Sequence, residues 1–180
     1  MKKQTMQVAF SAVIAALATV VMALAGIIPV ATIALPALSG LCVIPVVYEF
    51  GVRWGFGVYA VVSVLSFFLV ADREAALMYI VFFGYYPVLF AYFGHIRRRW
   101  LRVLVKLLVF NAAMALETLA ALFVLRIPWD ALFIDGVWGI PVLVTLFNLL
   151  LLVYDYTIPG LIVLYGRRIH PHLEKLLRLR

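Results

Sequence analysis

The stretch TMQVAFSAVIAALATVVMALAG, residues 5–26, decides what kind of protein this chain is. It is apolar throughout, contains no charged residue, and is long enough for an α-helix to cross a bilayer, which takes about 20 residues. Its small residues recur at spacings of four and three, which places them on one face of a helix. These residues are Thr5, Ala9, Ala12, Ala16, Thr19, Ala23 and Gly26.

This stripe of small residues predicts a closely packed neighbour. Lipid gives helices no hydrophobic drive to associate, so close approach through small side chains is what allows them to pack. We therefore expect an interface at Ala9, Ala12, Ala16 and Thr19. Two neighbours are open at this point, another helix of the same chain or a separate membrane protein.

The composition extends this interpretation to the whole chain. Hydrophobic residues make up 67% of the 180 residues and charged residues 13%, whereas soluble domains have about 45–50% and about 25%. We expect residues 1–180 to form one integral membrane domain. The single cysteine, Cys42, excludes an internal disulfide and a cysteine-rich metal site. Lys2 and Lys3 before an apolar run resemble a signal peptide, but the run is longer than the usual core of about 7–15 residues.

Six apolar segments of near-spanning length predict an all-α membrane protein with six transmembrane helices. They cover residues 7–28, 30–48, 52–70, 75–93, 103–125 and 137–165. The second segment contains Pro36, Gly40 and Pro45, and prolines kink membrane helices and free backbone carbonyls. We expect either a kinked helix or a distorted wall beside a ligand cavity. Residues 167–180 are typical of a short interfacial helix.

The distribution of Lys and Arg predicts the orientation. With the N-terminus inside, twelve basic residues fall in inner loops and tails and two, Arg73 and Arg126, fall outside. The twelve are Lys2, Lys3, Arg53, Arg97, Arg98, Arg99, Arg102, Arg167, Arg168, Lys175, Arg178 and Arg180. Lys106 lies just within the fifth segment. This bias places both termini in the cytoplasm, and an odd number of spans would spoil it.

Polar residues inside the apolar segments are candidates for a binding site, because burying them in hydrocarbon is costly. Asn111 and Thr118 share a face of the fifth segment, and Glu117 flanks it. Thr145, Asn148 and Asp155 share a face of the sixth. We expect an outward-facing pocket for a small polar or aromatic solute. Its candidate residues are Tyr79, Tyr85, Asn111, Glu117, Trp138 and Asn148. The alternative is that the amides join helices and the tryptophans form an interfacial belt.

Signatures of enzymes are missing from the sequence. It contains no G-x-x-x-x-G-K-[ST] phosphate-binding loop and no H-E-x-x-H zinc motif. We interpret His95, His170 and His172 as solvated residues rather than metal ligands. We therefore expect no catalytic activity, cofactor or metal in this chain.

The layout resembles the substrate-binding S components of energy-coupling factor (ECF) vitamin transporters. The shared features are about 180 residues, six spans, cytoplasmic termini and an alanine-rich first helix. In that family an A-x-x-x-A pattern on the first helix docks the transmembrane coupling subunit, and here Ala12-Val-Ile-Ala-Ala16 matches it. The resemblance implies a solute-binding subunit in a bacterial plasma membrane. Its partners would be a coupling subunit and, through it, separate ATPase subunits.

Two other functions stay open. The first is a structural membrane protein of the MreD-like cell-shape type, which also has six short spans and uses its helices for protein contacts. The second is a lipid-modifying enzyme with Glu117 and Asp155 as an acid pair, although no histidine or metal-ligand cluster accompanies them.

Overall fold

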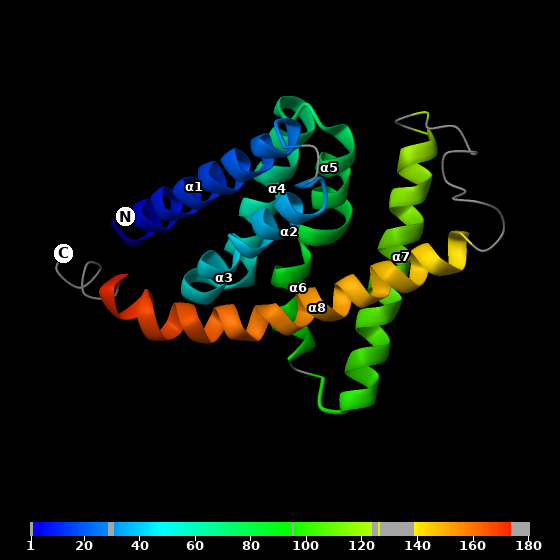
Figure 1. Ribbon diagram of the computed structural model, residues 1–180. Coiled ribbons are helices and arrows are strands. Elements are labelled where there is room, and N and C mark those ends of the chain that lie inside the picture. Colours follow the sequence, from blue (N-terminus) through cyan, green and yellow to red (C-terminus); the bar gives the residue numbers. More distant parts are fainter. Residues whose placement is uncertain (1, 29–30, 95, 124–125, 127–138, 174–180) are drawn as a thin grey trace.

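A computed structural model describes residues 2–28, 31–94, 96–123, 126 and 139–173, and every regular element among them is helical. The fold begins with two long helices, α1 (Lys2–Ala23) and α4 (Val52–Leu69), and two short helices connect them in the chain (Figure 1). The others are α2 (Ala34–Leu41), α3 (Ile44–Phe50), α5 (Arg73–Met78), α6 (Tyr86–Phe93), α7 (Arg99–Phe123) and α8 (Gly139–Arg168). The predicted all-α class is confirmed for these residues.

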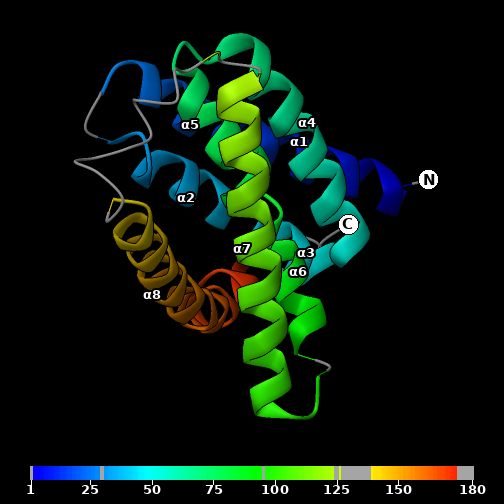
Figure 2. The same cartoon turned by 90° about the vertical axis from the view of Figure 1, so that its right-hand side faces the viewer.

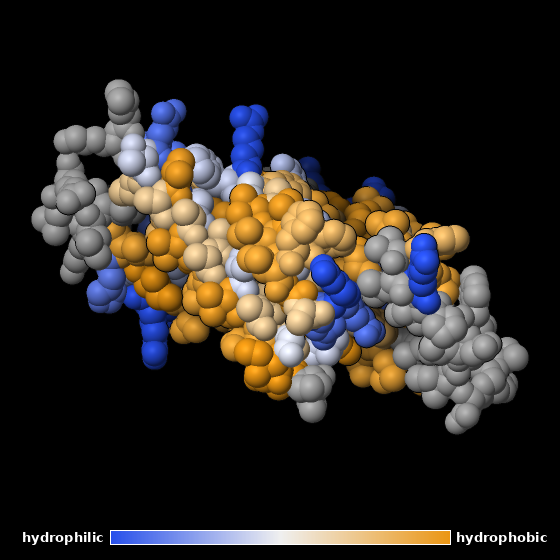
Figure 3. Space-filling view, turned by 90° about the horizontal axis from the view of Figure 1, so that it is seen from above, coloured by the Kyte–Doolittle hydropathy of each residue, from blue (hydrophilic) through white to orange (hydrophobic). Residues whose placement is uncertain are grey.

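Five of the described stretches are long and apolar enough to cross a membrane. They are Gln4–Gly26, Val52–Leu69, Arg73–Phe93, Arg99–Ala120 and Val144–Leu173. The sixth apolar stretch, Ala34–Phe50, is shorter. The face drawn in Figure 3 is mostly apolar in its described part, and hydrophilic side chains project singly from it. The chain is therefore a multi-pass helical membrane protein, and the cytoplasmic position of its termini stays a prediction.

The second segment is broken into two short helices, as its irregular sequence predicts. α2 ends at Leu41 and α3 begins at Ile44. Pro45 has no N–H, so it cannot donate to the carbonyl of Leu41 four residues earlier. At 1.5 Å per residue, even a continuous helix over Ala34–Phe50 would be about 26 Å long, less than the roughly 30 Å hydrocarbon core.

The fourth segment is broken as well, which the sequence analysis did not predict. A single π-type turn, Tyr79–Phe83, lies between α5 and α6. Pro87 leaves the carbonyl of Phe83 without its helical donor, and the hydroxyl of Tyr154 on α8 donates to it at 3.2 Å. The hydroxyl of Tyr59 on α4 donates to the carbonyl of Ile80 at 2.7 Å. Other helices thus satisfy the freed backbone groups, as hydrocarbon requires.

The two broken segments pack against each other at Gly40. A Cβ atom on this glycine would lie 2.3 Å from the carbonyl oxygen of Phe83 and 2.7 Å from the hydroxyl of Tyr154. Only a residue without a side chain allows this approach. Gly40 therefore holds the second segment directly against the break in the fourth.

The fourth segment also joins two hydrophobic cores. Tyr79 packs in the first core with residues of α1, α3 and α4, whereas Phe82 packs in the second with residues of α7 and α8. In an apolar stretch of 18 residues within this span, 67% of the residues are buried, whereas 33% or fewer are buried in the corresponding stretches of the other four spans. In Figure 2, α7 lies at the centre of the view, α1 and α4 lie to its right, and α8 lies to its left.

α1 buries one face and exposes the predicted stripe. Ser11, Ala15, Ala18, Met22 and Ala25 are buried. The side chains of the stripe lie on a different face. Ala9, Ala12, Ala16 and Ala23 are exposed, and Thr19 is half-buried.

Candidate functional site

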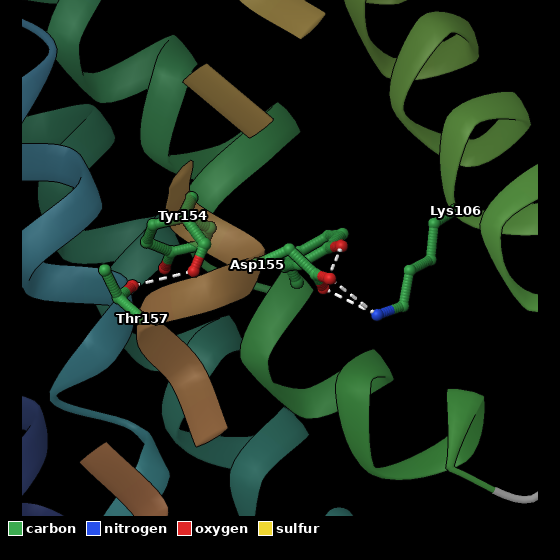
Figure 4. Close-up of polar contacts among 5 residues, drawn as sticks. Lys106, Tyr154, Asp155 and Thr157 are labelled. Atoms are coloured by element: carbon green, nitrogen blue, oxygen red, sulfur yellow. Dashed lines mark hydrogen bonds and ion pairs between the residues drawn. The ribbon is translucent and has the colours of Figure 1, made fainter. Parts of the chain in front are cut away.

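An ion pair joins α7 and α8 within the apolar part of the protein (Figure 4). The ammonium of Lys106 lies 2.7 Å from Oδ1 and 2.8 Å from Oδ2 of Asp155. The exposed fractions of the two side chains are 11% and 26%. Charged groups in membrane helices are rare and costly, and they face partners or cavities. Lys106 lies within the span Arg99–Ala120 and therefore belongs to this pair rather than to an aqueous loop.

Groups from α6 complete the environment of the ion pair. The hydroxyl of Tyr86 donates to Oδ1 of Asp155 at 2.8 Å. The ammonium of Lys106 lies 4.5 Å from the ring centre of Phe90 and 5.8 Å from that of Phe93. Aromatic faces attract cations, and this attraction strengthens where water is excluded. We call Tyr86, Lys106 and Asp155 the charged cluster.

The amides of Asn111 and Asn148 form a second polar contact between the same helices. Each Nδ2 donates to the Oδ1 of the other residue, at 3.2 and 3.3 Å. Each Nδ2 also donates to the backbone carbonyl four residues earlier in its own helix, at 2.8 Å. These two candidate residues are therefore brought together, with their amides directed at each other.

The candidate tyrosines, Tyr79 and Tyr85, belong to the fourth segment and pack toward α4. Tyr79 is fully buried in the first core. Its ring centre and that of Tyr85 lie 6.2 and 6.1 Å from the ring of Tyr59. The hydroxyl of Tyr79 has no hydrogen-bond partner among the described residues. In this conformation Tyr79 and Tyr85 belong to an aromatic group with α4 and not to the amide pair.

Glu117 lies toward the other end of α7 from the charged cluster. It is eleven residues from Lys106, about 16 Å along the helix axis. Its side chain is half-buried and has no hydrogen bond or ion pair within the described residues. Glu74 at the start of α5 is its charged neighbour. Trp138 lies outside the described residues.

Asp155 and Glu117 therefore have different surroundings. Asp155 is held by Lys106 and Tyr86, whereas Glu117 is half-buried with no ion pair within the described residues. Lys106, Glu117 and Asp155 all lie inside apolar segments, and no local pattern shows which acid pairs with the base. The sequence places Lys106 just within the fifth segment and does not predict its pairing with Asp155.

A further polar group lies where α3 and α8 meet. Oε1 of Glu49 accepts a hydrogen bond from Tyr165 at 2.9 Å and lies 2.8 Å from Nδ1 of His170. The ring of Tyr48 packs against both Tyr165 and His170, with ring centres 5.3 Å apart. The interpretation of His170 as a solvated residue was wrong, because it is paired with a mostly buried carboxylate.

The described residues contain no group of three or more His, Cys, Asp or Glu side chains that could hold a metal ion. Comparison of the chain with protein-family models, with curated proteins and with solved structures gives no match. Function is therefore inferred from the residues and their geometry.

Proposed function

We propose that this chain is the solute-binding membrane subunit of an ECF-type importer, and that a transmembrane coupling subunit docks on α1. The observation that supports this proposal is the exposed stripe on that helix. Ala9, Ala12 and Ala16 are exposed although another face of α1 packs against the rest of the chain. The helix thus has a second surface of small residues that its own fold does not use.

The chemistry of this surface suits a protein neighbour rather than lipid. Small side chains allow a second helix backbone to approach closely, which is the main source of helix association in membranes. The hydroxyl of Thr19 donates to the carbonyl of Ala15 at 2.8 Å, so it adds no unsatisfied polar group to the surface. The larger residues Val13, Leu17 and Val20 are also exposed and suit contact with acyl chains.

The solute would bind among the polar residues of α7 and α8. Asn111, Glu117 and Asn148 remain the candidates, because they offer amides and a carboxylate in mostly apolar spans and lie outside the charged cluster. The sequence has no phosphate-binding loop, so ATP hydrolysis would come from separate subunits. In this proposal the chain binds a small solute and catalyses no reaction.

The docking surface can be tested by comparing two double variants of the tagged protein in its native membrane. Ala12→Trp with Ala16→Trp fills the stripe. Val13→Trp with Val20→Trp places the same side chains on the neighbouring exposed face. We expect the wild-type protein and the second variant to co-purify with ATP-hydrolysing subunits and the first variant to lose them.

Two results would contradict the proposal. One is retention of the ATPase subunits by the Ala12→Trp, Ala16→Trp variant. The other is co-purification of cell-wall synthesis proteins with no ATPase, which would favour a structural protein of the MreD-like type. For the solute site, Glu117→Gln should weaken binding of any solute that stabilises the purified wild-type protein in a thermal-shift panel.

A further inference from the structure

An apolar groove opens between α3, α6 and α8. Its volume is about 190 Å³. Its lining residues are Ile44, Val47, Tyr48, Pro87, Phe90, Ala91 and Ile162. Every one of these except Tyr48 has a purely apolar side chain, and water gains no hydrogen-bonding partners in such a space. In a bilayer, hydrocarbon is the occupant that this lining favours.

At one end of the groove, Tyr48 connects the apolar lining to a polar group of side chains. The ring of Tyr48 forms part of the groove wall, and it also packs against Tyr165 and His170. Its hydroxyl lies above Gly166, where a Cβ atom would be 3.0 Å away. An occupant of the groove would therefore contact the Tyr48 ring next to His170, at this end of α8.

The end of the molecule that holds Tyr48 and His170 is basic. The start of α1, the α3–α4 junction and the end of α8 lie on the left of Figure 1. The described arginines at this junction and at the end of α8 are Arg53, Arg167 and Arg168. The acid among them, Glu49, is already paired with His170. An anionic group is therefore the complement of this end.

We propose that the groove binds one acyl chain of an anionic phospholipid, whose phosphate lies near Tyr48, His170, Arg167 and Arg168. The lipid is drawn from the leaflet at the basic end. An apolar lining whose tyrosine packs against an imidazole, at the end of α8 that carries two exposed arginines, matches an amphiphile with a negative head. This inference does not depend on the proposed transport function.

The proposal can be tested on the purified full-length protein with two lipids that carry the same acyl chains. Phosphatidylglycerol has an anionic head, and phosphatidylcholine has a zwitterionic one. We expect native mass spectrometry to show one retained phosphatidylglycerol per protein at concentrations where phosphatidylcholine is lost. We also expect phosphatidylglycerol to raise the thermal unfolding temperature more. Equal retention and equal stabilisation by the two lipids would overturn the proposal.

Two pairs of variants separate the groove from the head-group contacts. Ile162→Trp fills the groove, and Val163→Trp places the same side chain on the exposed face of α8. Arg167→Gln with Arg168→Gln removes two exposed charges, and Arg126→Gln removes one beyond the far end of α7. We expect Ile162→Trp and the double arginine variant to weaken phosphatidylglycerol retention at least tenfold and their controls to keep it.

The outcomes remain decisive if Ile162→Trp does not fold, because the arginines are exposed and test the head group independently. Unchanged lipid retention in the double arginine variant would overturn the proposal. So would a lipid-independent dimer that Ile162→Trp dissociates, since it would assign the groove to a second copy of the chain.

Discussion

Replacing Asp155 by asparagine keeps the shape of the side chain and removes its charge. Lys106, whose side chain is 11% exposed, then retains an oxygen neighbour but loses its counter-charge. Removing one partner of a buried ion pair costs about 3–5 kcal/mol, because the remaining charge stays buried without compensation. Asp155 is 26% exposed, so we expect the lower end of this range, about 3 kcal/mol of unfolding free energy.

Removing the whole charged cluster should cost less than removing one charge. In Lys106→Met with Asp155→Leu no charge is left, but the hydroxyl of Tyr86 loses its acceptor. An unsatisfied buried hydroxyl costs about 1–3 kcal/mol. Adding Tyr86→Phe removes this penalty as well. We expect the triple variant to lie within about 1 kcal/mol of the wild-type protein, since apolar replacements of buried ion pairs are often neutral.

Unfolding free energies can be measured by titrating SDS into detergent micelles and following tryptophan fluorescence. Glu117→Gln is the matched control, because it also neutralises an acid in a span but breaks no described ion pair. It should change the free energy by less than about 0.5 kcal/mol, as substitutions away from such contacts do. The reasoning fails if Asp155→Asn behaves like this control, or if the triple variant is as unstable as Asp155→Asn.

Three further experiments test the packing of the spans, each with the same unfolding measurement. Gly40→Ala places a methyl group against backbone and should cost about 1–3 kcal/mol, whereas Gly160→Ala, which has open space around it, should be neutral or stabilising. Equal effects of these two substitutions would contradict the close approach. Tyr154→Phe leaves a carbonyl of the π-type turn without its donor and should cost about 1–3 kcal/mol, and a neutral result would mean that another donor replaces it. In a double-mutant cycle, Asn111→Ala and Asn148→Ala should show a coupling energy of about 0.6 kcal/mol, and additive effects would exclude an energetic role for the amide pair.

Features that depend on local sequence could be predicted. Continuous apolar runs gave the spanning helices, because length and hydrophobicity alone determine whether a helix can cross a bilayer. Pro45 predicted the irregular second segment, since a missing N–H acts within one turn. The break at Pro87 follows the same rule but was not predicted, because the hydroxyls that donate to its free carbonyls belong to Tyr59 and Tyr154 on other helices.

Features that depend on how the helices are rotated against one another could not be predicted. Lys106 and Asp155 are 49 residues apart, and nothing local to either residue indicates that their side chains meet. Hydrogen bonding between the helices through Asn111 and Asn148 was the alternative to a solute site, and the structure shows these bonds. Tyr79 lies on the fourth segment as expected, but the π-type turn directs it into the first core.

The tyrosine hydroxyls at the broken fourth segment have a consequence for biosynthesis. Tyr59 precedes the π-type turn in the chain, so its donor is present when that turn enters the membrane. Tyr154 is synthesised about 70 residues after Phe83, and until α8 arrives one carbonyl of the break has no protein partner. We therefore expect the fourth segment to reach its final shape only after the last described span has been inserted, so that a ribosome stalled before α8 leaves an incompletely folded intermediate in the membrane.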